Sequence, residues 1–220
     1  MLHHEISGNG KKPLVLLHGF MENTTIWNEM EAHLSKDFTL IKIDLPGHGK
    51  SKVYQEIHTV ELMAEKVKEV IDALKLEKIN LLGHSLGGYV SLAFAENFPE
   101  ILESMTLFFS TTVADDEEKK AIRRRSIAVI DENFETFVKT SIPNLFSNNE
   151  KDILEGKIEL AKNIAKSTNK EGVKAAQLGM AERPDRTEIL ENLDAKILII
   201  AGKYDNAVKT ENLLKIIPEK

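Results

Sequence analysis

The 220-residue sequence contains no cysteine. This absence excludes disulfide bonds, a cysteine nucleophile and thiolate metal sites together. Long apolar runs are missing too, because no stretch approaches the ~18 apolar residues that a membrane-spanning helix needs. The first ten residues, MLHHEISGNG, lack the apolar core of a signal peptide. We therefore expect a cytoplasmic protein that has no membrane partner.

Positively charged residues are fewer than negatively charged ones: the sequence has 29 lysines and arginines and 35 aspartates and glutamates, which gives a net charge of -6. Such a surface has no field that would attract phosphate backbones, so nucleic acid is not expected as a partner. A single basic run, residues 123–125, follows an acidic run at 115–118 and is typical of the solvated face of a helix.

Short runs of valine, isoleucine and leucine alternate with longer amphipathic stretches. The short runs predict β-strands at residues 14–17, 39–44, 79–82, 104–109 and 197–201. The stretches 24–34 and 58–76 have apolar residues at helical spacing. This alternation predicts an α/β fold with a mostly parallel sheet and helices on both of its faces.

The alternation stops after Ser110. Residues 115–189 have no strong strand pattern and are too many for a loop in a compact domain. We predict a helical cap at 113–189, inserted into a core formed by residues 1–112 and 190–220. Its expected apolar anchors are Ile127, Ile130, Phe134, Phe137, Leu145 and Phe146.

The segment Gly83-His84-Ser85-Leu86-Gly87 contains a G-x-S-x-G motif. A strand pattern, KINLLG, runs into it and a helix pattern, LGGYVSLAFAENF, follows it. A serine in so tight a strand-to-helix turn has a strained backbone, and the flanking glycines avoid collisions with neighbouring backbone. Its hydroxyl is expected at the carboxyl edge of the sheet, where open α/β sheets bind ligands.

Two further motifs precede this turn. PLVLLHGF is a strand pattern that ends in His18-Gly19-Phe20, and IKIDLPGHGKS is a strand pattern that ends in a glycine-rich loop. With these motifs in this order, residues 14 to about 217 resemble the α/β-hydrolase superfamily, and its small esterases and enol-lactonases in particular. The resemblance implies a serine hydrolase that forms an acyl-enzyme with a small ester-like or lactone substrate.

The resemblance also assigns roles to residues. Ser85 takes the position of the nucleophile, and the backbone N–H groups of Phe20 and Leu86 take the two positions of the oxyanion hole. Asp205, in KILIIAGKYDNAV, takes the position of the catalytic acid. Many members of the superfamily have a proline shortly after this aspartate, where this sequence has Val208 and Lys209.

No residue takes the position of the catalytic base. Serine needs an adjacent base, and in this superfamily the order along the chain is Ser, Asp, His. All the histidines of this sequence precede Ser85: His3, His4, His18, His33, His48, His58 and His84. The resemblance implies a further strand, a histidine-bearing loop and a helix after Lys220. We therefore expect a C-terminally shortened protein that is inactive or severely impaired as it stands.

Two other functions stay open. C–C bond hydrolases and a synthase of menaquinone biosynthesis share this fold, and Arg123, Arg124, Arg183 or Arg186 could hold a substrate carboxylate in such an enzyme. More often, such arginines are ion-pair partners on the surface. A non-catalytic ligand-binding protein is the alternative of another class, because no histidine is present to activate Ser85.

The sequence predicts no cofactor and no metal, because it contains neither an H-x-x-x-H pair nor a G-x-x-x-x-G-K phosphate loop. A final expectation concerns assembly. If no further strand covers it, the strand at 197–201 presents unpaired backbone groups at the edge of the sheet, and such an edge favours self-association.

Overall fold

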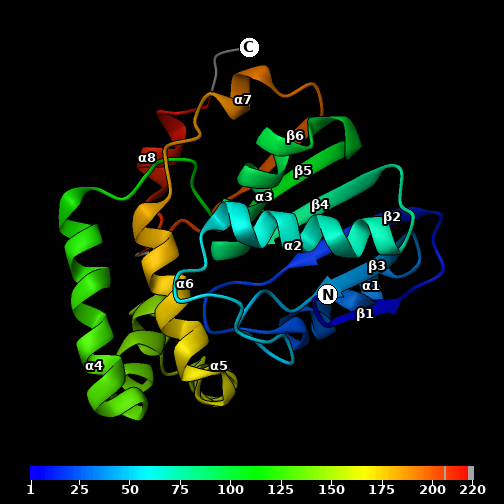
Figure 1. The fold of residues 1–220 in the computed structure, drawn as a ribbon. Helices are drawn as coiled ribbons and strands as arrows, with labels where there is room; N and C mark the ends of the chain where they lie inside the picture. The colour runs from blue at the N-terminus through cyan, green and yellow to red at the C-terminus, as the bar shows by residue number, and fades with distance from the viewer. Residues whose placement is uncertain (206, 218–220) are drawn as a thin grey trace.

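The computed structural model describes residues 1–205 and 207–217. Its centre is a six-stranded sheet of order β1-β3-β2-β4-β5-β6, in which β1 runs antiparallel to β3 and the other neighbours are parallel (Figure 1). The predicted mostly parallel sheet is thus confirmed. The strands are β1 (His4–Ser7), β2 (Lys12–Leu17), β3 (Phe38–Ile43), β4 (Ile79–His84), β5 (Leu102–Phe108) and β6 (Lys196–Ile200).

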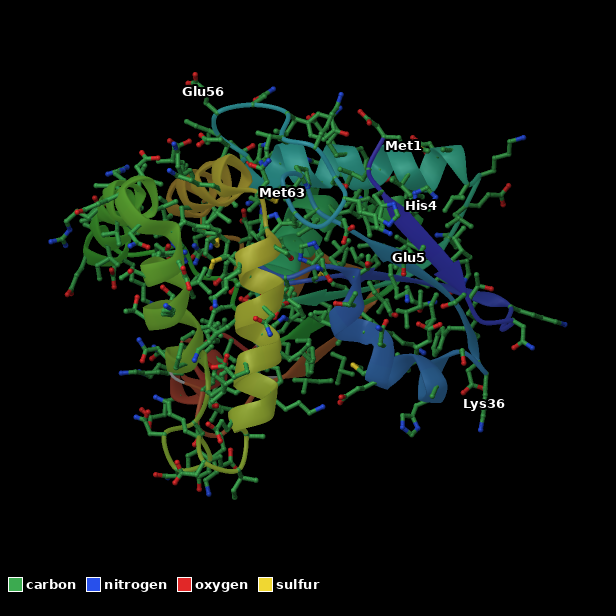
Figure 2. All side chains as sticks on the ribbon, turned by 90° about the horizontal axis from the view of Figure 1, so that it is seen from below. Met1, His4, Glu5, Lys36, Glu56 and Met63 are labelled. Atoms are coloured by element: carbon green, nitrogen blue, oxygen red, sulfur yellow. The ribbon has the colours of Figure 1, made fainter. Side chains whose placement is uncertain are left out.

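The sequence prediction missed β1. Its four residues, HEIS, contain a single aliphatic side chain, so no apolar run marks them as a strand. Ile6 itself is exposed. Figure 2 shows His4 and Glu5 on this strand, along one edge of the sheet. An edge strand of this kind is held by main-chain pairing with β3, which a side-chain pattern does not reveal.

Alternate residues of the strands face opposite layers of helix. Val15 and Leu17 of β2 belong to the large core beneath α2 (Val60–Ala73) and α3 (Leu86–Asn97). Leu14 and Leu16 pack on the other face against Trp27, which ends the short helix η1 (Thr24–Trp27) before α1 (Asn28–Leu34). The expected covering of both faces is therefore confirmed.

Helix α2 follows the predicted apolar stripe. The Thr59 side chain accepts a hydrogen bond from the Leu62 N–H and caps the first turn. Figure 2 shows Met63 on this helix, and its side chain is fully buried, whereas Glu56 lies at the outer end of the preceding loop. The buried residues of the stripe are Val60, Met63, Ala64, Val67, Val70 and Ile71.

The segment between β5 and β6 is helical. Figure 1 shows α4, α5 and α6 standing together beside the sheet. The longest, α4, bends at Asn133, whose side chain accepts a hydrogen bond from the Thr136 N–H and caps the second half. No helix in the described part of the chain is long and apolar enough to cross a membrane. The remaining helices are α4 (Glu117–Ser141), η3 (Ile142–Leu145), α5 (Glu155–Ser167), α6 (Lys170–Glu182), α7 (Ile189–Asn192), η2 (Pro99–Ile101) and α8 (Thr210–Leu214).

An apolar cluster joins these helices to the loop after β2. Phe20 and Met21 contribute to it from that loop, and four of the six anchors that the sequence suggested, Ile130, Phe134, Phe137 and Phe146, contribute from the helices. Ile127 is half-buried and does not belong to the cluster. Leu145 is outside the cluster as well, because 56% of its surface is exposed. The cluster consists of Met21, Ile130, Phe137, Val138, Ile142, Ala165 and Val173, with Phe20, Phe134, Phe146 and Ala161 against it. The predicted cap boundaries at 113 and 189 stay a prediction.

Candidate active site

Ser85 forms the tight turn between β4 and α3. Its backbone has φ 49° and ψ −110°, a conformation that L-residues rarely adopt. Hydrogen bonds hold it on both sides: its N–H donates to the Phe108 carbonyl at 2.9 Å, and its own carbonyl accepts from Ser110 Oγ, also at 2.9 Å. The serine therefore sits at the carboxyl end of the central strands in a conformation that the surrounding backbone enforces.

The two glycines of the motif allow this turn to form. A Cβ atom at Gly83 would lie 2.2 Å from the carbonyl oxygen of Gly87, and one at Gly87 would lie 2.3 Å from that of Leu17. Real Cβ atoms do not approach backbone so closely. The spacing of the motif thus follows from contact between the turn, α3 and the neighbouring strand β2.

Phe20 lies in a turn at the end of β2. The Glu22 N–H closes this turn by donating to the Gly19 carbonyl at 3.3 Å, and Met21 has a positive φ of 58°. A Cβ atom at Gly19 would lie 2.8 Å from His84 Nδ1, so this turn lies against the end of β4. Leu86 is the first residue of α3, where a backbone N–H has no acceptor within the helix. The two predicted N–H donors are therefore on segments that are in contact.

Asp205 lies in the loop after β6, and β5 separates that strand from β4. Its Oδ1 accepts hydrogen bonds from the N–H groups of Ala207 at 2.7 Å and Val208 at 2.9 Å. The neighbouring Asn206 is outside the described residues. The carboxylate thus holds a turn at the same sheet edge as Ser85, and the described structure shows no direct contact between the two side chains.

His18 braces the loop that carries Phe20. Its Nδ1 donates to the Gly19 carbonyl at 2.7 Å, and its Nε2 accepts from the Leu45 N–H at 2.9 Å. The ring must be neutral to make both bonds. Burial lowers the pKa of His18 to about 4, despite the opposing effects of Gly19 and Glu22. Both ring nitrogens are therefore committed to backbone.

His48 and His58 support the loop after β3 in a similar way. Burial lowers the pKa of His48 to about 3, and the nearby His18 ring adds to this effect. The His48 Nδ1 is 3.0 Å from the Pro46 carbonyl, and the His58 Nε2 accepts from the Tyr54 N–H at 3.1 Å. All three buried histidines are thus structural, which agrees with their interpretation from the sequence.

The sequence analysis gave no role to Glu22, which the structure places at the centre of the site. Its Oε2 accepts from the Gly19 N–H at 2.6 Å and lies 2.8 Å from His84 Nδ1. Burial alone would raise the pKa of Glu22, but the charge and the hydrogen bond of His84 lower it. The only available signal was an acidic residue close behind His18-Gly19.

Three of the four arginines that could bind a substrate carboxylate are engaged with acidic side chains. Arg183 contacts Asp115 at 2.9 Å, and Arg186 contacts Glu96 at 2.8 Å and Glu61 at 2.6 Å. Arg123 also pairs with Asp115. For these three side chains the pairing agrees with the alternative of ion-pair partners, but Arg183 and Arg186 are buried and do not lie on the surface. Among residues 1–205 and 207–217, no group of three or more His, Asp or Glu side chains could hold a metal ion.

Comparison with known families gives a match over residues 12–218 to the model of the α/β-hydrolase fold. The chain belongs to this family. The solved structure of a thermophilic esterase from Thermogutta terrifontis superposes with a TM-score of 0.92 and 34% identity, over 99% of this chain and 81% of that one. The predicted α/β-hydrolase fold is thereby confirmed.

Two curated relatives differ in how much of them is matched. A putative 2-succinyl-6-hydroxy-2,4-cyclohexadiene-1-carboxylate synthase of Bacillus subtilis is 29% identical over 212 residues, which are 90% of this chain and 75% of that protein. An uncharacterized protein of Mycobacterium tuberculosis is 35% identical over 111 residues, or 50% of this chain. The match spans only 32% of the mycobacterial protein's length.

Proposed function

We propose that this α/β-hydrolase is a serine hydrolase that cleaves small ester or lactone substrates through an acyl-enzyme at Ser85. The observation that carries the proposal is the enforced conformation of Ser85 beside the loop of Phe20. A strained serine at the carboxyl edge of the sheet has little structural use, but it exposes a hydroxyl to a ligand. Similarity to the Thermogutta esterase supports the substrate class.

The proposed chemistry has two halves. The Ser85 hydroxyl loses its proton to a base, and Oγ bonds to the carbonyl carbon of the substrate. The N–H groups of Phe20 and Leu86 donate to the oxyanion, which then collapses as the ester C–O bond breaks and the alcohol leaves with the proton. Water repeats the attack on the acyl-enzyme, releases the acid and returns the proton to Ser85.

The remaining parts of the machinery are assigned as follows. Asp205 is proposed as the acid that orients the base. The base is proposed to be a histidine, and four histidines of this chain are engaged elsewhere, because the three buried ones are bonded to backbone and His84 Nδ1 is held by Glu22. The helices α4–α6 act as a cap that selects the substrate, because they share an apolar cluster with Phe20.

A fluorophosphonate probe tests the nucleophile. Ser85 Oγ attacks phosphorus and displaces fluoride, so a covalent adduct marks an activated serine. We expect slow labelling of the 220-residue chain and at least tenfold faster labelling when imidazole in the buffer accepts the proton. Ser85→Ala abolishes both rates, whereas Ser91→Ala, which removes a fully buried hydroxyl farther along α3, leaves both rates unchanged.

The outcomes separate enzyme from binding protein. An adduct mapped to Ser85 by mass spectrometry supports the hydrolase. Absence of any adduct, with imidazole and also in a form extended by a histidine-bearing C-terminal segment, contradicts it and favours a non-catalytic ligand-binding protein. Hydrolysis of short p-nitrophenyl esters by the extended form then defines the substrate class.

Similarity to the Bacillus synthase supports a second candidate, an enzyme that acts on a carboxylated diene. Such a substrate needs a cation that is free to bind its carboxylate. Arg183 and Arg186 are both buried in ion pairs with acidic side chains, which favours the esterase. Turnover of a carboxylated diene, with no turnover of p-nitrophenyl esters, would favour the synthase-like enzyme over the esterase.

A further inference from the structure

The Glu22 carboxylate connects the two segments that carry the predicted oxyanion donors. One oxygen, Oε2, accepts the Gly19 N–H at 2.6 Å and contacts His84 Nδ1 at 2.8 Å. Gly19 immediately precedes Phe20, and His84 immediately precedes Ser85. A single atom thus lies between the turn after β2 and the turn after β4, although the two residues are 62 positions apart in the sequence.

Both of these turns contain a residue in an unfavourable backbone conformation. Met21 has φ 58° and Ser85 has φ 49°, and such conformations persist only where surrounding contacts enforce them. On the β4 side, the hydrogen bond from Ser85 to Phe108 contributes to this enforcement. On the β2 side, Gly19 is held by the carboxylate of Glu22 and by the ring of His18.

Glu22 and His84 form an ion pair when the His84 ring is protonated. Burial alone would lower the pKa of His84, but the charge and hydrogen bond of Glu22 raise it, and Asp205 adds to this effect. The ring is also confined by Phe108 and Phe109, whose centroids lie 5.6 and 6.2 Å from its own. When protonated, the confined ring makes a shorter and stronger hydrogen bond than a neutral ring makes.

We propose that Glu22 and His84 are a pair of positioning residues, which fix the Phe20 N–H relative to the Leu86 N–H and thereby set the stabilisation of the oxyanion at Ser85. The inference rests on the proposed function and adds two residues to it. Both act through backbone: Glu22 holds the Gly19 N–H, and His84 is the residue before Ser85. Pre-organised donors lose much of their effect when they are displaced by a fraction of an ångström.

The test is Glu22→Gln, which keeps the shape of the side chain and removes its charge. We expect the rate of Ser85 labelling at saturating fluorophosphonate, with imidazole present, to fall on the order of tenfold. The probe concentration that gives half-saturation is expected to stay within about twofold, because ground-state binding does not use the oxyanion. Glu65→Gln on the exposed side of α2 is the matched control and leaves both quantities unchanged.

A second variant guards against misfolding. His84→Gln retains an N–H donor for Glu22 but removes the imidazolium, with His33→Gln on the exposed side of α1 as its control. The double variant is expected to label no more slowly than the slower single variant, because the two residues act as one unit. Additive losses, or a Glu22→Gln rate within twofold of the parent, overturn the inference.

A measurement without chemistry separates this inference from the proposed function. If the parent protein never labels, the serine hydrolase fails, but hydrogen exchange at the Gly19 amide still tests the pair. At least tenfold faster exchange of that amide in Glu22→Gln, with Glu65→Gln unchanged, supports the positioning role. Unchanged exchange of the Gly19 amide overturns it.

Discussion

Three residues other than glycine adopt a positive φ at the carboxyl ends of adjacent strands. They are Met21 after β2, Ser85 after β4 and Phe109 after β5, with φ values of 58°, 49° and 50°. Each such residue costs the fold about 1–3 kcal/mol. Because all three lie at the edge that contains the candidate site, the strain is concentrated where a ligand would bind.

The strain at Ser85 gives the first prediction. Glycine tolerates a positive φ, so Ser85→Gly is expected to raise the free energy of unfolding by about 1 kcal/mol relative to Ser85→Ala. Alanine lacks the hydroxyl but keeps the Cβ atom, so the comparison isolates backbone strain. Urea unfolding of both variants measures the difference. Equal midpoints and slopes would show that the turn is not strained.

At the scale of elements, α6 packs directly against backbone. A Cβ atom at Gly179 would lie 1.7 Å from the His58 carbonyl oxygen, and one at Gly172 would lie 2.1 Å from that of Gly47. The His58 N–H also donates to the Ala175 carbonyl of α6 at 3.0 Å. The helix is therefore fixed to the glycine-rich loop after β3, and through it to the core.

Gly179→Ala tests this contact. The added methyl group must push α6 away from the loop, and overpacking of this kind costs about 1–3 kcal/mol. Gly156→Ala in α5 is the control, because its Cβ would meet nothing within 4 Å. The control is expected to be neutral or stabilising by up to about 1 kcal/mol. Calorimetric melting that ranks the two variants in the opposite order would contradict the packing.

The outer strand gives a prediction about assembly. In the described part of the chain β6 pairs only with β5, and its Leu198 and Ile200 are 55% and 39% exposed. An apolar edge strand favours pairing with a second copy. We expect the 220-residue chain to self-associate, and Leu198→Lys to shift it toward the monomer in sedimentation velocity.

Ile153→Lys is the control for that shift, since Ile153 is 85% exposed but lies outside the sheet. A parent protein that stays monomeric at about 100 µM, where pairing with a Kd of about 100 µM or tighter would populate the dimer, would refute the prediction. If both lysine variants raised the monomer fraction equally, the association would come from exposed apolar surface in general and not from pairing at β6.

Most of the elements could be predicted because they have a periodic pattern. The parallel strands are apolar runs, and α2 has a stripe of buried residues at helical spacing. The β1 strand and the bend of α4 at Asn133 were not predictable in this way, because main-chain pairing and a side-chain cap produce them. Leu145 was misjudged since its apolar character did not reveal which side of η3 faces solvent.

At the scale of the whole molecule, the sequence predicted which residues lie at the candidate site but not the side-chain contacts that hold them there. The order of glycine motifs placed Ser85, Phe20 and Leu86 on neighbouring strand ends. The contact of Glu22 with His84 depends on the side-by-side position of β2 and β4, which lie far apart in the sequence. The roles of Ser85, Phe20, Leu86 and Asp205 stay predictions until labelling and kinetics test them.

The buried histidines predict how stability depends on pH. An unfolded chain takes up protons on His18 and His48 near pH 6.5, whereas the folded protein does so only near pH 4 and 3. Lowering the pH below about 6.5 therefore favours unfolding, by up to about 1.4 kcal/mol per pH unit for each histidine. The contribution of the His84–Glu22 pair to stability has the opposite pH dependence, because it is lost as the pH rises through the raised pKa of His84.

Melting temperatures between pH 7 and 5 test this prediction above the range where carboxylates titrate. We expect a steady fall in the melting temperature over that interval. His48→Gln removes one buried imidazole and is expected to flatten the fall, whereas the exposed His33→Gln retains it. A pH dependence of the melting temperature that His48→Gln leaves unchanged would show that this ring is not buried in the neutral form.

Phe20 and Met21 belong to the donor loop and also to the apolar cluster beneath α4 and α6. The shape of the pocket wall and the position of the Phe20 N–H therefore depend on the same residues, although a protein engineer would want to change the first without the second. Any mutation that reshapes the wall of the pocket at these positions also moves a hydrogen-bond donor. Directed evolution toward a bulkier acyl group is therefore expected to lose turnover first, and to recover it through second mutations in α4 or α6 that return the loop to its original place.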